Sequence, residues 1–90
     1  MPHWSQTAEE SLQRNIEYYA KEDPMTAYRI FDAVLEGAEV LDDHHNIGRV
    51  GRIKGTRELV INGTPFILVY QCNPNEIVIL NLLHGAQKWP

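Results

Sequence analysis

The sequence predicts an α+β fold, in which a short N-terminal strand and a helical hairpin pack on an antiparallel sheet of three to four strands. Two observations predict this fold. Apolar residues recur at helical spacing between residues 8 and 41, and they form short β-branched or aromatic runs between residues 58 and 83. The chain has 90 residues, a length that suits one domain over residues 1–90.

Two helices are expected in the first half. The first should begin at Thr7-Ala8-Glu9-Glu10, which fits the capping box that satisfies the first free amides of a helix. The second should begin at Asp23-Pro24, because Asp caps helices and Pro is tolerated at the first helical position. The short connection predicts a hairpin. The apolar positions are Ala8, Leu12, Ile16 and Tyr19 in the first helix, and Ala27, Ile30, Phe31, Val34, Ala38 and Leu41 in the second.

Three strands are expected in the second half, at Glu58–Ile61, Phe66–Cys72 and Ile77–Leu83. Asn62-Gly63 predicts a tight hairpin between the first two, because both residues accept positive φ. Asn73-Pro74-Asn75 supplies the next turn, so the strand at residues 66–72 lies in the middle. A short edge strand is expected at His3-Trp4, ahead of the first helix.

Both faces of this sheet are apolar. The middle strand alternates Phe66, Leu68, Tyr70 and Cys72 with Ile67 and Val69, and the last strand alternates Ile77 and Ile79 with Val78, Leu80 and Leu82. One helical hairpin can cover only one face. An uncovered apolar face usually marks a partner interface. The alternative is that the N-terminal arm and the loop at residues 42–55 fold over it.

Charge is divided unevenly along the chain, whose net charge is -4. Residues 1–43 contain three basic and ten acidic side chains, whereas the second half is basic. Four of its cations lie close together, and they are Arg49, Arg52, Lys54 and Arg57. Such a cluster can bind an acidic partner, although a solvated arginine-rich loop is an equally good interpretation.

Several kinds of chemistry are disfavoured. The segment from Gly48 to Gly55 lacks the ending of a P-loop and does not join a strand to a helix. His44-His45 beside Asp42-Asp43 has no second cluster at ligand spacing, so no metal site is expected. No nucleophile motif is present. A histidine at the end of a strand, His84, could act as an acid or base, but a structural role fits it better by residue type.

The chain is expected to act in the cytoplasm. No apolar run approaches the length of a membrane span, and the first residues lack the pattern of a signal peptide. The lone Cys72 cannot form an internal disulfide, which favours a reducing compartment.

Three stretches together resemble toxins of the RelE/ParE superfamily, which form one half of bacterial toxin–antitoxin pairs. In chain order they are Gly48-Arg49-Val50-Gly51-Arg52-Ile53-Lys54-Gly55-Thr56-Arg57-Glu58-Leu59, Phe66-Ile67-Leu68-Val69-Tyr70 and Ile79-Leu80-Asn81-Leu82-Leu83-His84-Gly85-Ala86-Gln87. They are similar to the family's Gly-Arg…Gly-Thr-Arg-Glu-Leu segment, its central Val-Tyr strand and its closing Leu-His-Gly-x-Gln strand. Trp4-Ser5 and residues 8–12 match the usual start of the first helix. The resemblance spans essentially the whole chain and implies the fold expected above.

The resemblance implies a cognate antitoxin, whose extended or helical tail wraps around the toxin. It leaves two activities open. RelE-like members cleave mRNA on the ribosome with basic residues and a C-terminal acid or base, whereas ParE-like members poison DNA gyrase and need no catalytic residues. Here the strand at residues 58–61 has no lysines, and Ile67 stands where many relatives have Arg. Only Arg57 and His84 remain as ribonuclease candidates, so the ParE-like interpretation is favoured.

The expected antitoxin- or target-binding residues are Arg49, Arg52, Lys54, Arg57, Ile67, Val69, His84, Gln87 and Trp89. Antitoxin and gyrase are the expected partners, with the ribosome and mRNA as the alternative target. A toxin fold that has lost its toxicity is a further alternative. Catalytic residues, a cofactor, a metal, a membrane and direct binding of DNA by the toxin are not expected.

Overall fold

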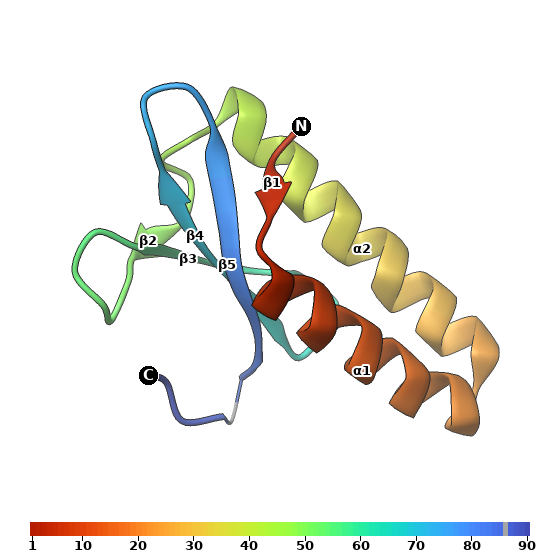
Figure 1. The fold of residues 1–90 in the computed structure, drawn as a ribbon. Coiled ribbons are helices and arrows are strands. Elements are labelled where there is room, and N and C mark those ends of the chain that lie inside the picture. Colours follow the sequence, from red (N-terminus) through yellow and green to blue (C-terminus); the bar gives the residue numbers. More distant parts are fainter. Residues whose placement is uncertain (86) are drawn as a thin grey trace.

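The computed structural model has two layers, a helical hairpin and a twisted sheet that the hairpin covers on one face (Figure 1). It describes residues 1–85 and 87–90, so Ala86 of the closing motif lies outside the described residues. The predicted α+β class is confirmed. The elements are β1 (His3–Trp4), α1 (Gln6–Glu22), α2 (Pro24–Asp43), β2 (Arg49–Val50), β3 (Arg57–Val60), β4 (Phe66–Cys72) and β5 (Ile77–His84).

Helix α1 begins two residues earlier than the capping-box pattern predicts. Its N-cap is Ser5, whose Oγ accepts a hydrogen bond from the Ala8 amide at 3.1 Å. The same hydroxyl donates to the Leu80 carbonyl at 3.0 Å, and the Ser5 amide donates to the Ile79 carbonyl at 2.9 Å. The cap at Thr7 was therefore wrong, because bonds to β5 hold Ser5 at the start of the helix.

The predicted start of α2 is confirmed at Asp23-Pro24. One carboxylate oxygen of Asp23 accepts a hydrogen bond from the Met25 amide at 3.1 Å, and the other accepts one from the Thr26 hydroxyl at 2.8 Å. The Asp23 amide donates to the Tyr19 carbonyl, so one residue ends α1 and begins α2. The two helices consequently fold back on each other as a hairpin.

The sheet has five strands in the order β1-β5-β4-β3-β2. The edge strand at His3-Trp4 is confirmed, but it pairs with β5 in parallel, which makes the sheet mixed rather than antiparallel. A second edge strand, β2, pairs with β3 and was not predicted. Two-residue strands carry too little periodicity to be detected locally, since each is defined by the strand it pairs with.

The turn between β3 and β4 is wider than the two-residue hairpin that Asn62-Gly63 predicts. The Thr64 amide donates to the Ile61 carbonyl, and the Ile61 amide donates to the Phe66 carbonyl. Of Asn62 and Gly63, only Gly63 has positive φ, at +79°, as a type II turn requires at its third position. Asn62 therefore does not adopt the conformation that was expected for it.

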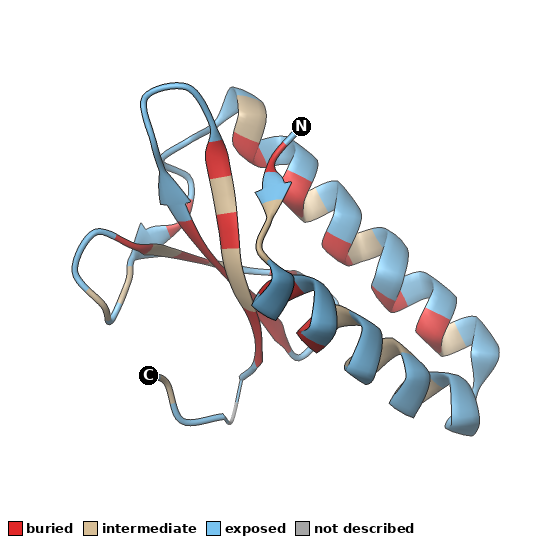
Figure 2. Ribbon diagram, in the orientation of Figure 1, coloured by how far each residue is buried: buried red, intermediate tan, exposed pale blue. Residues whose placement is uncertain are grey.

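The main core lies between the hairpin and the sheet (Figure 2). A bulge between β4 and β5 shifts the register between Val69, which pairs with Asn81, and Tyr70, which pairs with Ile79. The shift turns Leu82 toward the helices, opposite to the face predicted from strict alternation. This core contains Phe66, Leu68, Tyr70, Ile77, Ile79 and Leu82 from the sheet, with Ala8, Ile30, Val34, Ala38 and Leu41 from the helices.

The sequence suggested that the other face of the sheet is uncovered, but the structure shows buried residues there. Ile67, Val69 and Leu83 are buried there, with Leu80 and Trp89 packed against them. The cover is the C-terminal tail, which passes on the side of the sheet away from the helices (Figure 1), rather than the N-terminal arm. The prediction that this face stays uncovered in the isolated chain was therefore wrong.

Candidate protein-binding site

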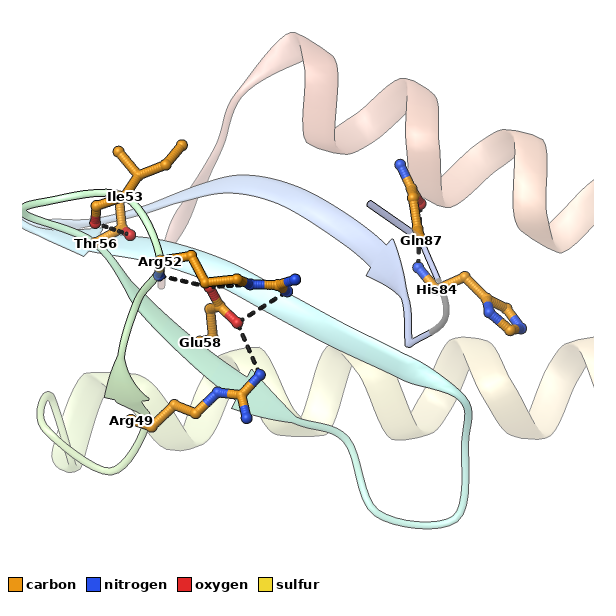
Figure 3. A network of polar contacts seen from close by, with 7 residues as sticks. All are labelled: Arg49, Arg52, Ile53, Thr56, Glu58, His84 and Gln87. Atoms are coloured by element: carbon orange, nitrogen blue, oxygen red, sulfur yellow. Dashed lines mark hydrogen bonds and ion pairs between the residues drawn. The ribbon is translucent and has the colours of Figure 1, made fainter. Parts of the chain in front are cut away.

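A buried carboxylate organises the basic segment of the chain (Figure 3). Glu58 on β3 is 1% exposed and points to the face away from the helices, as its pairing partner Val69 does. It accepts hydrogen bonds from Arg49 Nη2 at 3.0 Å and from the amide, Nε and Nη2 of Arg52 at 2.9, 3.1 and 3.1 Å. The two guanidinium groups remain accessible, with side chains 60% and 41% exposed.

The surroundings of Glu58 keep it ionised. Burial by itself raises the pKa of this carboxyl group, because it disfavours the charged form. Hydrogen bonds from the side chain and amide of Arg52, and from Arg49, more than offset that effect and lower the pKa to about 2. Glu58 is consequently ionised at neutral pH and holds two arginines against the sheet.

The opposite side of the same segment is anchored by Tyr70 and Arg57. The Tyr70 hydroxyl accepts a hydrogen bond from the Gly48 amide at 3.0 Å and donates one to the His45 carbonyl at 2.9 Å. Arg57 Nη1 donates to the Gly48 carbonyl at 2.7 Å. A Cβ at Gly48 would lie 2.8 Å from the Tyr70 ring, so this close approach needs glycine. The segment that links α2 to β2 is therefore fastened to the sheet.

The tip of the basic segment is closed by a small turn. The Thr56 hydroxyl donates to the Ile53 carbonyl at 2.6 Å (Figure 3). The Gly51 amide donates to the Thr56 carbonyl at 2.8 Å. Lys54 lies at this tip, exposed and without an ion-pair partner in the described part of the chain. Of the four predicted cations, two thus bind Glu58, one binds backbone carbonyls and one projects into solvent.

The sequence analysis did not single out Glu58. The signal that could have found it is its position, since Glu58 is the one acidic residue between residues 44 and 75 and immediately follows the cationic stretch. An acid on a strand next to several arginines is a candidate partner for them. Which arginines it binds depends on the return of the segment as β2, where Arg49 lies opposite Glu58.

The other predicted site residues lie at the end of β5 and in the tail. The His84 ring packs edge-on against Phe66, with ring centroids 5.8 Å apart, and the side chain is exposed. Gln87 closes a turn on His84, whose amide donates to Gln87 Oε1 at 3.3 Å. Trp89 packs on Ile67, Val69 and Leu83, and its indole nitrogen is buried without a hydrogen-bond partner among the described residues.

The structure does not bring Arg57 and His84 together. Arg57 pairs with Tyr70 on one side of β4, and His84 pairs with Phe66 on the other side. Four residues along β4 and two strand spacings across it separate their Cα atoms by roughly 16 Å. Figure 3 shows His84 and Gln87 at one end of the sheet and the arginine cluster at the other.

Among the described residues, the two adjacent histidines belong to no cluster of metal ligands. His44 and His45 lie on an exposed loop, where His45 Nε2 contacts the Asp42 carbonyl at 3.0 Å. Across residues 1–85 and 87–90 no three His, Cys, Asp or Glu side chains gather as metal ligands. Within the same residues neither helix is long and apolar enough to cross a membrane.

Comparison with known proteins identifies a matching family, a similar protein and a similar solved structure. Residues 3–89 match the family described as "ParE toxin of type II toxin-antitoxin system, parDE". The chain is 34% identical over 87 residues to Putative toxin Y4kP of Sinorhizobium fredii, a match that covers 97% of this chain and 90% of that protein. A chain of the solved structure "Chromosomal ParDE TA system from P. aeruginosa" matches with a TM-score of 0.83 at 22% identity, over 91% of both chains. The last match shows a shared fold.

Proposed function

The chain belongs to the ParE toxin family of type II toxin–antitoxin systems, and from this premise we propose that it inhibits DNA gyrase and is neutralised by a cognate antitoxin. Its site of action on this proposal is the bacterial cytoplasm, where gyrase works. The resemblance to the gyrase-poisoning branch is the basis of the target, and the arrangement of the basic residues supports it.

One observation carries the choice of gyrase over mRNA. Cleavage of RNA needs a general base and a cation close to one phosphate. The two candidates for these roles, Arg57 and His84, lie at opposite ends of the sheet. Arg57 Nη1 is moreover engaged by the Gly48 carbonyl. An arrangement of this kind suits a protein that binds its target rather than one that cleaves a phosphodiester.

The face away from the helices is the proposed contact surface for gyrase. Arg49 and Arg52 lie at one end of it and remain partly exposed beside Glu58, with Lys54 at the tip of their segment. Trp89 lies on the same face, over the apolar patch of the sheet, and Gln87 precedes it in the tail. A rigidly held arginine pair beside an aromatic side chain has the composition typical of protein interfaces.

Two of the expected contact residues can take part only indirectly. Ile67 is 9% exposed and Val69 is 0% exposed, so a partner reaches them only if Trp89 and the tail move aside. On this proposal Ile67 and Val69 pack beneath Trp89, and the exposed side chains of the same face contact gyrase.

The test of gyrase inhibition uses the purified chain with gyrase and supercoiled DNA. Gyrase should accumulate broken DNA, and a translating extract should show no toxin-dependent cleavage of mRNA. An Arg49/Arg52 double alanine variant should lose gyrase inhibition, while Arg14→Ala, on the exposed side of α1, serves as the charge-loss control. Intact gyrase activity at every toxin concentration, with the chain folded, would contradict the proposal.

His84 separates the two activities. Under gyrase inhibition, His84→Ala should leave toxicity in place if the variant remains folded. Under ribosome-dependent cleavage, the same change should abolish growth arrest, and codon-specific mRNA fragments made by the parent chain should vanish. A folded chain that neither makes gyrase accumulate broken DNA nor cleaves mRNA would instead indicate a toxin fold that has lost its toxicity. A short neighbouring gene with a DNA-binding start and a disordered tail would identify the antitoxin.

A further inference from the structure

The basic segment presents two guanidinium groups that converge on one buried oxygen atom (Figure 3). Arg49 Nη2 and Arg52 Nη2 donate to the same atom, Glu58 Oε1, at 3.0 and 3.1 Å. The two nitrogen atoms are therefore no more than about 6 Å apart. One small oxyanion can bridge a separation of this size, because its oxygens accept charge-assisted hydrogen bonds at about 2.8 Å.

Several donors on these two groups remain available to a ligand. A guanidinium group carries five N–H donors on three nitrogen atoms. Arg52 directs Nε and Nη2 at Glu58, and Arg49 directs Nη2 alone. Among the described residues, no acceptor binds Nη1 of either arginine or Nε of Arg49. Because the two side chains are 60% and 41% exposed, a ligand can reach these atoms from solvent.

Positive charge dominates the surroundings of this arginine pair. Glu58 offsets one of the two guanidinium charges, and it is only 1% exposed, so it lies beneath the arginines rather than beside a ligand. Lys54 is exposed at the tip of the same segment. Ten of the twelve acidic side chains belong to residues 1–43, whose helices cover the opposite face of the sheet. The acidic and basic sides of the molecule therefore face in opposite directions.

We propose that the arginine pair binds a phosphate group of the DNA backbone, on DNA that gyrase holds while the toxin is bound. This inference rests on the proposed inhibition of gyrase, an enzyme that works on DNA. Guanidinium groups suit phosphate because their planar donors match its oxygens, and most contacts of proteins with DNA go to the backbone. The acidic hairpin repels a duplex, so DNA can approach only from the side of Arg49, Arg52 and Lys54.

The net charge of the chain explains why gyrase is needed for this contact. A net charge of -4 repels a polyanion, so the few phosphate contacts of one short segment give only weak binding to free DNA. When gyrase holds the toxin and the DNA together, the same contacts form within one complex, at a high effective concentration. The toxin should therefore bind the complex of gyrase and DNA more tightly than it binds either component.

The first test compares binding of the labelled full chain to gyrase with and without duplex DNA. The parent chain should bind at least about tenfold more tightly when DNA is present, and the difference should shrink as the salt concentration rises. An Arg49/Arg52 double alanine variant should lose this difference but still bind gyrase alone, whereas Arg14→Ala, on the exposed side of α1, should keep it.

Two outcomes of this test would overturn the proposal. One is equal affinity of the parent chain for gyrase with and without DNA. The other is a double alanine variant that no longer binds gyrase alone, which would show that Arg49 and Arg52 contact an acidic surface of the enzyme rather than the DNA.

Two changes separate a specific phosphate site from general charge attraction. Replacing the phosphates of the duplex one at a time by uncharged methylphosphonates should weaken binding at one or two positions and leave the double alanine variant unaffected. Glu58→Gln makes the chain more positive but removes the anchor that the two arginines share. It should weaken binding to gyrase with DNA about threefold or more, because the arginines are no longer held together, whereas general charge attraction would strengthen that binding. Circular dichroism verifies folding. Tighter binding by Glu58→Gln, or a uniform effect of all methylphosphonates, would contradict a specific site.

A measurement on the chain alone keeps this inference separate from the proposed function. In NMR spectra, the side-chain N–H signals of Arg49 and Arg52 should shift and saturate as inorganic phosphate is added at constant ionic strength, whereas those of Arg14 should not. Saturable shifts in a chain that fails to affect gyrase would leave the phosphate site in place and remove gyrase as the target. A chain that inhibits gyrase, with no such shift and no tighter binding in the presence of DNA, would do the reverse.

Discussion

Glu58 accepts three hydrogen bonds from Arg52, one from its backbone amide at 2.9 Å and two from its guanidinium group at 3.1 Å each. The backbone bond adds to the ion pair, because it ties the path of the chain at residue 52 to strand β3. With Arg49 added at 3.0 Å, the carboxylate fastens two of the four cations of this segment to β3. The presentation of the arginines therefore depends on a residue that no partner can touch.

Replacing Glu58 with Gln should lower the free energy of unfolding by about 2 kcal/mol, as expected for losing hydrogen bonds between charged groups in a buried position. The arginines can rehydrate because they are partly exposed, which keeps the loss moderate. Urea unfolding at pH 7 measures this decrease in the free energy of unfolding. The control is Glu36→Gln on the exposed side of α2, expected to change stability by less than about 0.5 kcal/mol. Equal effects of both changes would refute a special role for Glu58.

The stabilisation by Glu58 should disappear in acid. The pKa of its carboxyl group is 4.5 when unperturbed and about 2 in the folded chain, so the folded state favours the ionised form. The contribution is fully present above pH 4.5 and is lost as the pH falls toward 2. The stability gap between the parent chain and Glu58→Gln should accordingly be constant near neutrality and narrow between pH 4.5 and 2. A gap that is the same at pH 7 and pH 3 would contradict the lowered pKa.

Tyr70→Phe should destabilise the chain by about 1–3 kcal/mol, because the buried Gly48 amide and the His45 carbonyl lose their shared partner. Hydrogen exchange should become faster at the Gly48 amide, while amides in the middle of α2 change only with global stability. Tyr28→Phe is the matched control, since Tyr28 is 70% exposed and has no such bonds. Unchanged protection at Gly48 would show that the hydroxyl does not hold this segment.

Trp89→Ala should expose the apolar patch on the face away from the helices. The indole covers Ile67, Val69 and Leu83, but Trp89 is only half-buried and its N–H has no hydrogen-bond partner among the described residues. The expected cost is about 1–2 kcal/mol, below that of a fully buried aromatic side chain. Binding of the dye ANS should rise in this variant and not in Lys88→Ala, which changes the exposed neighbouring residue. Equal dye binding by both would mean that Trp89 does not cover the patch in solution.

The sequence by itself determined the helical hairpin, the three longer strands and the family. Asp23 and Pro24 start α2 through bonds to Met25 and Thr26, which lie two and three residues away. Helical periodicity and capping depend on such near neighbours, so they can be recognised locally. The resemblance to toxins rests on residue identities in their order along the chain, so it can be recognised without a structure.

Only the tertiary structure decided the positions and contacts of the functional side chains. Ser5 replaces Thr7 as the cap because β5 lies beside it, 75 residues further along the chain at Leu80. The bulge on β5 turns Leu82 toward the helices, and the tail brings Trp89 over Val69. Glu58 binds Arg49 and Arg52 because the segment returns to β3 as an edge strand. These outcomes depend on pairing between distant segments, whose free energy is set by burial and hydrogen bonding across the fold rather than by neighbouring residues.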